Sequence, residues 1–253
     1  AQLQRLLRSN PRGVLVLEPV HSQAWLRELL EVLREKRVPT VFYGDVPGAE
    51  EFDRVASDHE AGAYELTRWL ISRGRRRILT TSPGIIAELW FRERCRGYER
   101  AMREAGLEPQ PTLVLPEQPL PPLHEEDEAA WKSYFESVVR HYVGYLVEHL
   151  LSPQPPDALL AASDGLTFYL AAACRMLGRE PNRDIWIAGY DNYWADTSER
   201  ALETTPPCAT VDKRNELLGI EAARLLQQRI ANQLPSGPQH HLVKPELIIT
   251  APT

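Results

Sequence analysis

Cysteine is scarce in this sequence of 253 residues. The three cysteines, Cys95, Cys174 and Cys208, are odd in number and far apart, and no pair has C-x-x-C or metal-site spacing. A disulfide framework is therefore not expected to organise the fold. This cysteine usage favours a reduced protein of the cytoplasm.

Long apolar runs are also missing. No run approaches the ~18 residues that a membrane-spanning helix needs. The first ten residues, AQLQRLLRSN, contain no apolar core of a signal peptide and resemble the end of a helix. We therefore expect no contact with a membrane.

Positive charge and catalytic motifs are lacking too. The formal net charge is −6, whereas a module that binds duplex DNA normally has a basic face. The chain shows no G-x-S-x-G elbow, phosphate-binding glycine loop, H-E-x-x-H motif or cluster of histidine and cysteine. We therefore expect no enzyme, no cofactor and no bound metal, and only weak binding of nucleic acid by this chain itself.

The sequence does contain a regular alternation of short apolar runs and amphipathic stretches. This alternation is typical of parallel α/β units with helices on both faces of a sheet. We expect the tail HLVKPELIIT to form one final strand. The clearest expected strands are GVLVLEP, VPTVFYGD, RRRILTTSP, DALLAASD and DIWIAGYD, and the clearest expected helices span about 22–36, 131–151 and 215–231.

Polar residues follow the expected strands at the points where the strands end. Open α/β sheets bind ligands outside the carboxyl ends of their strands. For any single residue a capping or turn role is the ordinary alternative, whereas at least some of the set should line a shared pocket. Carboxylates, arginine and flat aromatic rings together suit a sugar-like ligand. The strand-end residues are Glu18, Asp45, Asp58, Ser82, Ser163, Asp164, Tyr190, Asp191 and Asn192.

These landmarks resemble the effector-binding core of lactose-repressor/galactose-repressor transcription regulators, which have the type I periplasmic-binding-protein fold. The resemblance covers most of residues 14–250. The matching segments, in the family's order, are VASDHEAGAYELTRWLISRGRRRI, RCRGYERAMREAGL, DALLAASDGLTFYLAAACRMLGREPNRDIWIAGYDN, PPCATVDKRNELLGIEAARLLQQRI and VKPELII.

The resemblance implies two doubly wound parallel-sheet lobes joined by three crossing strands, with an effector clamped between the lobes. It places residues 1–74 and 212–232 in the first lobe, and residues 75–211 and 233–253 in the second. It also implies that the natural protein continues upstream, through a first strand, into a DNA-binding head that this chain does not contain.

The resemblance further implies a set of ligand-binding residues. Arg94 stands at the arginine of the family's R-x-x-G-[FY] motif and Asp191 at the aspartate of its G-[FY]-D motif, and both hold ligand hydroxyls. Ser163 and Asp164 stand where the family usually has Asn-Asp, so the serine has a shorter reach. Trp90, about one helical turn before Arg94, is expected to stack on a sugar ring, with core packing as the alternative. The remaining expected pocket residues are Asp58, Lys213, Asn215 and Trp131.

The leading hypothesis is the effector-sensing and dimerisation domain of a bacterial transcription regulator. A mono- or disaccharide would shift the equilibrium between two lobe arrangements and so alter the affinity of a homodimer for operator DNA. The alternative is a periplasmic sugar-binding protein of a transport system. The cysteine usage and the tail, from PPCATV to VKPELII, favour the cytoplasmic regulator.

Overall fold

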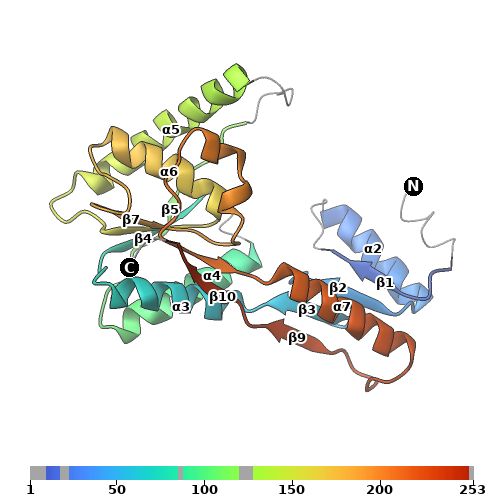
Figure 1. Ribbon diagram of the computed structural model, residues 1–253. Helices are drawn as coiled ribbons and strands as arrows, with labels where there is room; N and C mark the ends of the chain where they lie inside the picture. The colour runs from blue at the N-terminus through green and yellow to red at the C-terminus, as the bar shows by residue number, and fades with distance from the viewer. Residues whose placement is uncertain (1–9, 18–22, 85–87, 120–127, 251–253) are drawn as a thin grey trace. The chain divides into compact units, whose positions relative to one another are not determined.

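The computed structural model describes residues 10–17, 23–84, 88–119 and 128–250, in which strands and helices alternate (Figure 1). The expected N-terminal helix and the strand-end residue Glu18 lie outside these ranges. The chain divides into two compact units, Ala1–Asp58 with Arg214–Lys244 and His59–Lys213 with Pro245–Thr253. It therefore passes from one unit to the other three times.

The first unit contains a parallel sheet that is covered on both faces. Successive strand residues point to opposite faces, so Phe42 packs with the apolar side of α2 (Gln23–Lys36), whereas Val41 packs with Leu218 of α7 (Asn215–Ile230). The strand order is β1 (Val14–Val16), β2 (Thr40–Tyr43), β3 (Asp53–Ser57) and β9 (His240–Val243).

The second unit has the same layered design. Its four parallel strands, in spatial order, are β5 (Leu113–Val114), β4 (Ile78–Ser82), β6 (Ala158–Ala161) and β7 (Trp186–Ala188). Ile78 packs with one pair of helices, α3 (His59–Ser72) and α4 (Leu89–Glu104). Leu79 packs with the other pair, α5 (Glu128–Leu150) and α6 (Asp164–Met176). The predicted α/β class with parallel sheets is therefore confirmed.

The strand order places a reversal of winding between β4 and β6, because the chain first adds β5 on one side of β4 and then β6 on the other. Ligands bind at such a reversal, outside the carboxyl ends of the strands. In this unit those ends lead to Ser82 and Ser163. Two short 3-10 turns, η1 (Trp194–Asp196) and η2 (Ser198–Ala201), follow β7.

Two features differ from the sequence-based expectations. The helix α3 belongs to the second unit, because it packs closely against α4: a Cβ on Gly97 would lie 2.1 Å from the carbonyl oxygen of Glu60. The tail forms two strands instead of one. Strand β9 pairs in parallel with β3 of the first unit, and β10 (Glu246–Ile249) pairs antiparallel with β8 (Ala209–Asp212) of the second. The units consequently divide at residues 58, 213 and 244, where 74, 211 and 232 were expected.

Candidate functional site

Arg94 lies on α4, and its side chain is buried although it is charged (4% exposed). Its Nη1 donates a hydrogen bond to the carbonyl oxygen of Ala162, 2.6 Å away, just beyond β6. Its Nη2 donates to Oδ1 of Asp191 at 2.9 Å. A buried charge is tolerated where it is paired and hydrogen-bonded in this way. Arg94 therefore joins α4 to the loops that follow β6 and β7.

Two aromatic rings enclose the guanidinium group of Arg94. Its Cζ lies 3.5 Å from the centroid of the Tyr190 ring and 4.4 Å from that of the Trp90 ring. Cation–π contacts of this kind are strongest where water is excluded. Trp90 therefore helps to hold Arg94 in place, and its stacking on a sugar ring stays a prediction.

Asp191 follows β7 and adopts a φ of 94°, a left-handed conformation that aspartate and asparagine adopt more readily than other non-glycine residues. Its Oδ1 lies 2.9 Å from Nη2 of Arg94 and 3.3 Å from Nζ of Lys213. Among the described residues, none donates a hydrogen bond to its Oδ2. The carboxylate is thus fixed through one oxygen and keeps the other free to accept a ligand hydroxyl.

The site also contains a histidine that the sequence analysis did not select. His59, the first residue of α3, accepts a hydrogen bond from Nε of Arg94 through its Nδ1, at 3.4 Å. Burial lowers the pKa of His59 to about 3, and the charges of Arg94 and Lys213 act in the same direction. The imidazole is therefore neutral near pH 7, as an accepting Nδ1 requires. His59 could have been selected from the sequence because it directly follows Asp58, at the end of an expected strand.

Asp164 is fully buried at the start of α6. Its Oδ1 accepts a hydrogen bond from the Thr210 hydroxyl at 2.7 Å. Its Oδ2 accepts from the backbone N–H groups of Tyr193 and Trp194 at 2.8 and 3.2 Å. Burial raises the pKa of Asp164 to about 7, although these three hydrogen bonds act in the opposite direction. One carboxylate oxygen therefore bonds to β8 and the other positions the loop after β7.

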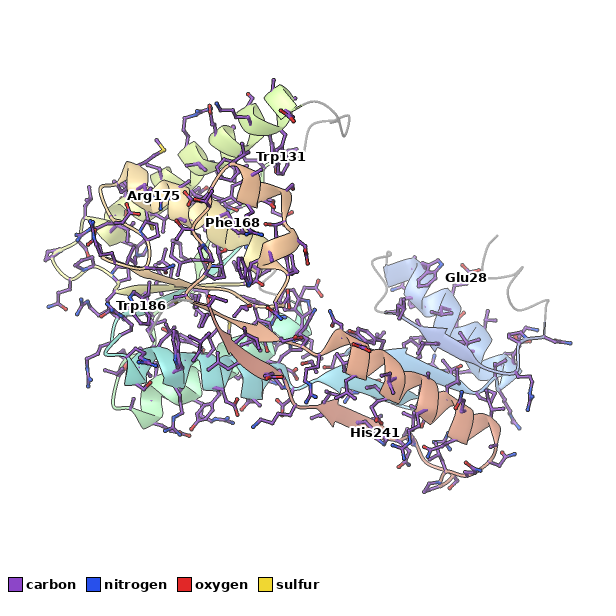
Figure 2. All side chains as sticks on the ribbon, viewed as in Figure 1. Glu28, Trp131, Phe168, Arg175, Trp186 and His241 are labelled. Carbon is purple, nitrogen blue, oxygen red and sulfur yellow. The ribbon has the colours of Figure 1, made fainter. Side chains whose placement is uncertain are left out.

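A cavity of about 770 Å³ lies beside the same loops of the second unit. Two predicted site residues line it: Ser163, which directly precedes α6, and Trp131, in the first turn of α5 (Figure 2). The indole N–H of Trp131 is buried and has no acceptor among the described residues. Folding thus brings Ser163 and Trp131 together in one cavity wall.

Part of the cavity wall consists of residues that the sequence analysis missed. The Tyr169 hydroxyl donates to Oε1 of Glu199 at 3.2 Å, and the Tyr193 hydroxyl accepts from the N–H of Gly165 at 3.2 Å. The closeness of Tyr193 to Asp191 in the sequence could have indicated its role. Glu199 lies in the irregular stretch WADTSERALETTPP, where no periodicity predicts which side chains face inward.

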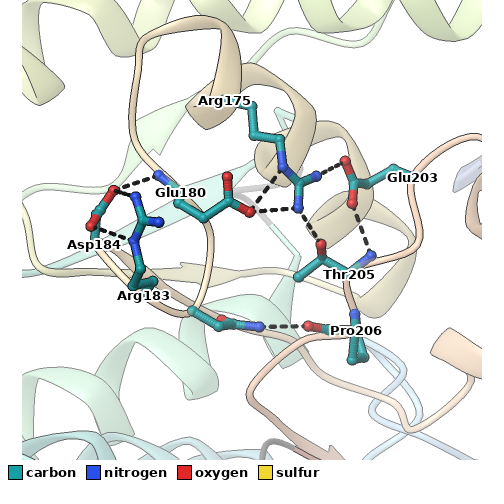
Figure 3. A network of polar contacts seen from close by, with 8 residues as sticks. Arg175, Glu180, Arg183, Asp184, Glu203, Thr205 and Pro206 are labelled. Carbon is teal, nitrogen blue, oxygen red and sulfur yellow. Dashed lines mark hydrogen bonds and ion pairs between the residues drawn. The ribbon is translucent and has the colours of Figure 1, made fainter.

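A polar network holds the segment after η2 against α6 (Figure 3). Arg175, in the last turn of α6, donates to Oε1 of Glu180 at 2.9 and 3.1 Å and to the Thr205 hydroxyl at 2.6 Å. It also pairs with Glu203, whose Oε1 accepts from the N–H of Thr205 at 2.8 Å. Because Glu203 is only 7% exposed, this pairing neutralises a buried charge close in sequence to Glu199.

Two predicted site residues belong to the first unit. The backbone N–H of Asp58, directly after β3, donates to the carbonyl oxygen of Val243 at 3.0 Å. Asn215, the first residue of α7, accepts through Oδ1 a hydrogen bond of 2.8 Å from the hydroxyl of Tyr43, which ends β2. These contacts place Asp58 and Asn215 at the carboxyl edge of the first sheet. Their roles in binding a ligand stay predictions.

The described residues show neither a metal site nor a membrane span. Within them, no three His, Cys, Asp or Glu side chains are grouped as metal ligands would be. None of their helices combines the length and the apolar character needed to cross a membrane. All three cysteines are free.

Comparison with known proteins supports the architecture. A family model of the periplasmic binding protein-like domain matches residues 67–251. The HTH-type transcriptional regulator CelR of Thermobifida fusca is 31% identical over 225 residues, which are 87% of this chain and 57% of the relative. The HTH-type transcriptional repressor PurR of Histophilus somni (strain 129Pt) is 26% identical over 251 residues, which are 98% of this chain and 66% of the relative. This chain thus spans less than two thirds of the length of these relatives.

Solved structures agree. A complex of the transcriptional regulator CelR with cellobiose is 26% identical, with a TM-score of 0.72 over 98% of this chain and 68% of that chain. A regulatory protein of the LacI family from Chloroflexus aggregans is 25% identical, with a TM-score of 0.74 over 98% of this chain and 79% of that chain. The chain belongs to the periplasmic binding protein-like domain family, and its similarity to these regulators confirms the predicted resemblance to the effector-binding cores of the lactose-repressor family.

Proposed function

We propose that this chain is the effector-sensing domain of a transcription regulator and that its effector is a saccharide. The observation that carries the proposal is the Arg94–Asp191 pair, in which a fixed arginine holds a carboxylate with one free oxygen. Carboxylate oxygens accept hydrogen bonds from sugar hydroxyls, and aromatic walls cover the apolar faces of sugar rings. The neighbouring cavity supplies such walls.

The relatives support the regulator over the transport alternative. CelR and PurR are both named as HTH-type regulators, and one solved CelR structure contains cellobiose. A ligand of this chain would act by binding one arrangement of the protein more tightly than another, with no bond made or broken. Binding to operator DNA through a domain outside this chain, a homodimeric state and a cytoplasmic location complete the proposal.

A binding screen tests the saccharide effector. We expect at least one of a panel of mono- and disaccharides, with cellobiose included, to raise the unfolding midpoint of the chain and to bind saturably in calorimetry. Asp191→Asn removes the charge that accepts ligand hydroxyls and should weaken that binding by about 10- to 100-fold, as expected for charged hydrogen bonds.

The control for this screen is Glu108→Gln, which neutralises an exposed carboxylate outside the cavity wall. It should leave the affinity unchanged. A panel in which no saccharide binds the native chain would contradict the proposed effector class, and unchanged affinity in Asp191→Asn would contradict the assigned site.

A further inference from the structure

The cavity beside Ser163 has a one-sided charge. Of the described residues that line it, two are carboxylates, Glu117 and Glu199, and none is lysine, arginine or histidine. Carboxylates can accept hydrogen bonds from the hydroxyls of a neutral sugar, but a wall that holds carboxylates and no cation also favours a ligand with a positive charge.

Several cations of the second unit are paired with other groups, and Arg200, which directly follows Glu199, donates to the carbonyl oxygen of Ala195 at 3.1 Å. Arg94 and Lys213 both pair with Asp191, and Arg175 pairs with Glu180 and Glu203. Within the described part of the chain, no salt bridge involves Glu117 or Glu199. Glu199 accepts a hydrogen bond from the hydroxyl of Tyr169, and this donor carries no charge. Glu117, which is exposed, and Glu199, which is half-buried, therefore have no ion-pair partner among the described residues.

Aromatic rings make up much of the remaining wall. The rings of Trp131 and Tyr134 lie 5.7 Å apart, and Tyr142, Tyr169 and Tyr193 line the cavity as well. Burial and the charge of Glu117 raise the pKa of Tyr134, and burial raises that of Tyr142, so these hydroxyls stay neutral. Electron-rich ring faces attract cations, most strongly where water is excluded.

Carboxylates without an ion-pair partner and clustered aromatic rings both favour a positively charged group. We infer that this cavity binds a saccharide ring that carries a protonated amino group. The ring faces would cover the apolar side of the sugar, and Glu199 with Glu117 would accept hydrogen bonds from the ammonium group. The same wall repels sugar phosphates and sugar acids. This inference rests on the proposed saccharide effector and narrows its chemical class.

Three disaccharides of the same linkage separate charge from shape: cellobiose, the β-1,4-linked disaccharide of glucosamine, and the N-acetylated form of the latter. Calorimetry at pH 6.5 should show the amino form binding about tenfold more tightly than cellobiose, which corresponds to ~1.4 kcal/mol. The N-acetylated form is uncharged, so it should show no such gain.

Substitution of Glu199 tests whether the cavity is responsible. In Glu199→Gln the preference for the amino form over cellobiose should fall to about threefold or less, while Glu108→Gln, outside the wall, should keep the full preference. Equal or tighter binding of cellobiose by the native chain would overturn the inference and leave the saccharide effector standing. If the preference for the amino form survives in Glu199→Gln, the inference is also overturned, because residues outside this wall would then recognise the ammonium group. If none of the three sugars nor any other saccharide binds, the proposed function itself fails.

Discussion

At the scale of single residues, the Arg94–Asp191 pair depends on a histidine that carries no charge. A protonated His59 would place a donor against the guanidinium group from which its Nδ1 now accepts a hydrogen bond. Burial and two neighbouring cations avoid this conflict by keeping the pKa of His59 near 3. The cost of this arrangement is sensitivity to acid, because an unfolded histidine titrates near pH 6.5.

The free energy of unfolding should therefore depend on pH in a way that reflects the low pKa of His59. Between pH 6.5 and 3 the unfolded chain binds a proton that the folded chain does not, so the free energy of unfolding falls as the pH falls through this window. When the pH is lowered from 6.5 to 5, the free energy of unfolding should fall by about 1–2 kcal/mol less in His59→Gln than in the native chain. Denaturant unfolding at each pH measures this difference. NMR of the native chain should show an unprotonated His59 ring at pH 5, and a titration midpoint near 6.5 would contradict the assignment.

At the scale of elements, the short turn η2 has little regular structure to hold it in place. Its position beside the cavity depends on the Arg175 network, which ties the following segment to the last turn of α6 (Figure 3). A network of paired charges and hydrogen bonds can thus fix the position of an irregular segment that lacks the regular backbone hydrogen bonds of a strand.

Removal of Arg175 should loosen this segment. In Arg175→Met the buried carboxylate of Glu203 loses its partner, so we expect the free energy of unfolding to fall by about 1–3 kcal/mol. Hydrogen exchange of residues 198–206 should become faster. Arg183→Met is the matched control, because Arg183 pairs with Asp184 at the surface, where solvent screens the pair, and it should leave the free energy of unfolding nearly unchanged. Equal losses in the two variants would contradict a special role for the network.

At the scale of the whole molecule, apolar side chains remain exposed near the ends of α5 and α6. Leu151 and Met176 are 62% and 59% exposed, and Tyr145 is 39% exposed. The side chain of Arg179 donates to the carbonyl oxygen of Leu150, which links the ends of the two helices. Large apolar side chains that stay exposed are candidates for a surface that binds another protein.

The expected homodimer can be tested on the chain itself. Sedimentation velocity at micromolar concentration should show a dimer. The double substitution Leu151→Glu and Met176→Glu should shift the population toward the monomer if this area lies in the interface, because buried carboxylates without partners are costly. Circular dichroism would check that the variant stays folded. A native chain that sediments as a monomer at this concentration would contradict the prediction.

The sequence by itself determined the class of fold, and its resemblance to a known family selected Arg94 and Asp191, whose role in ligand binding stays a prediction. Its apolar periodicity reports which side chains are buried, and this was enough for the alternating strands and helices. The motifs around Arg94 and Asp191 were enough for their selection, and the structure brings the two within 2.9 Å of each other.

Only the tertiary structure decided which buried surfaces meet. Periodicity does not show that α3 packs on α4, or that the tail splits at Lys244 into strands of two different sheets. It equally gives no sign that Asp164 turns inward to hold the loop after β7, or that Glu199 joins Trp131 in one wall. These features depend on contacts between segments far apart in the chain, and a local pattern of apolar and polar residues carries no information about a distant partner.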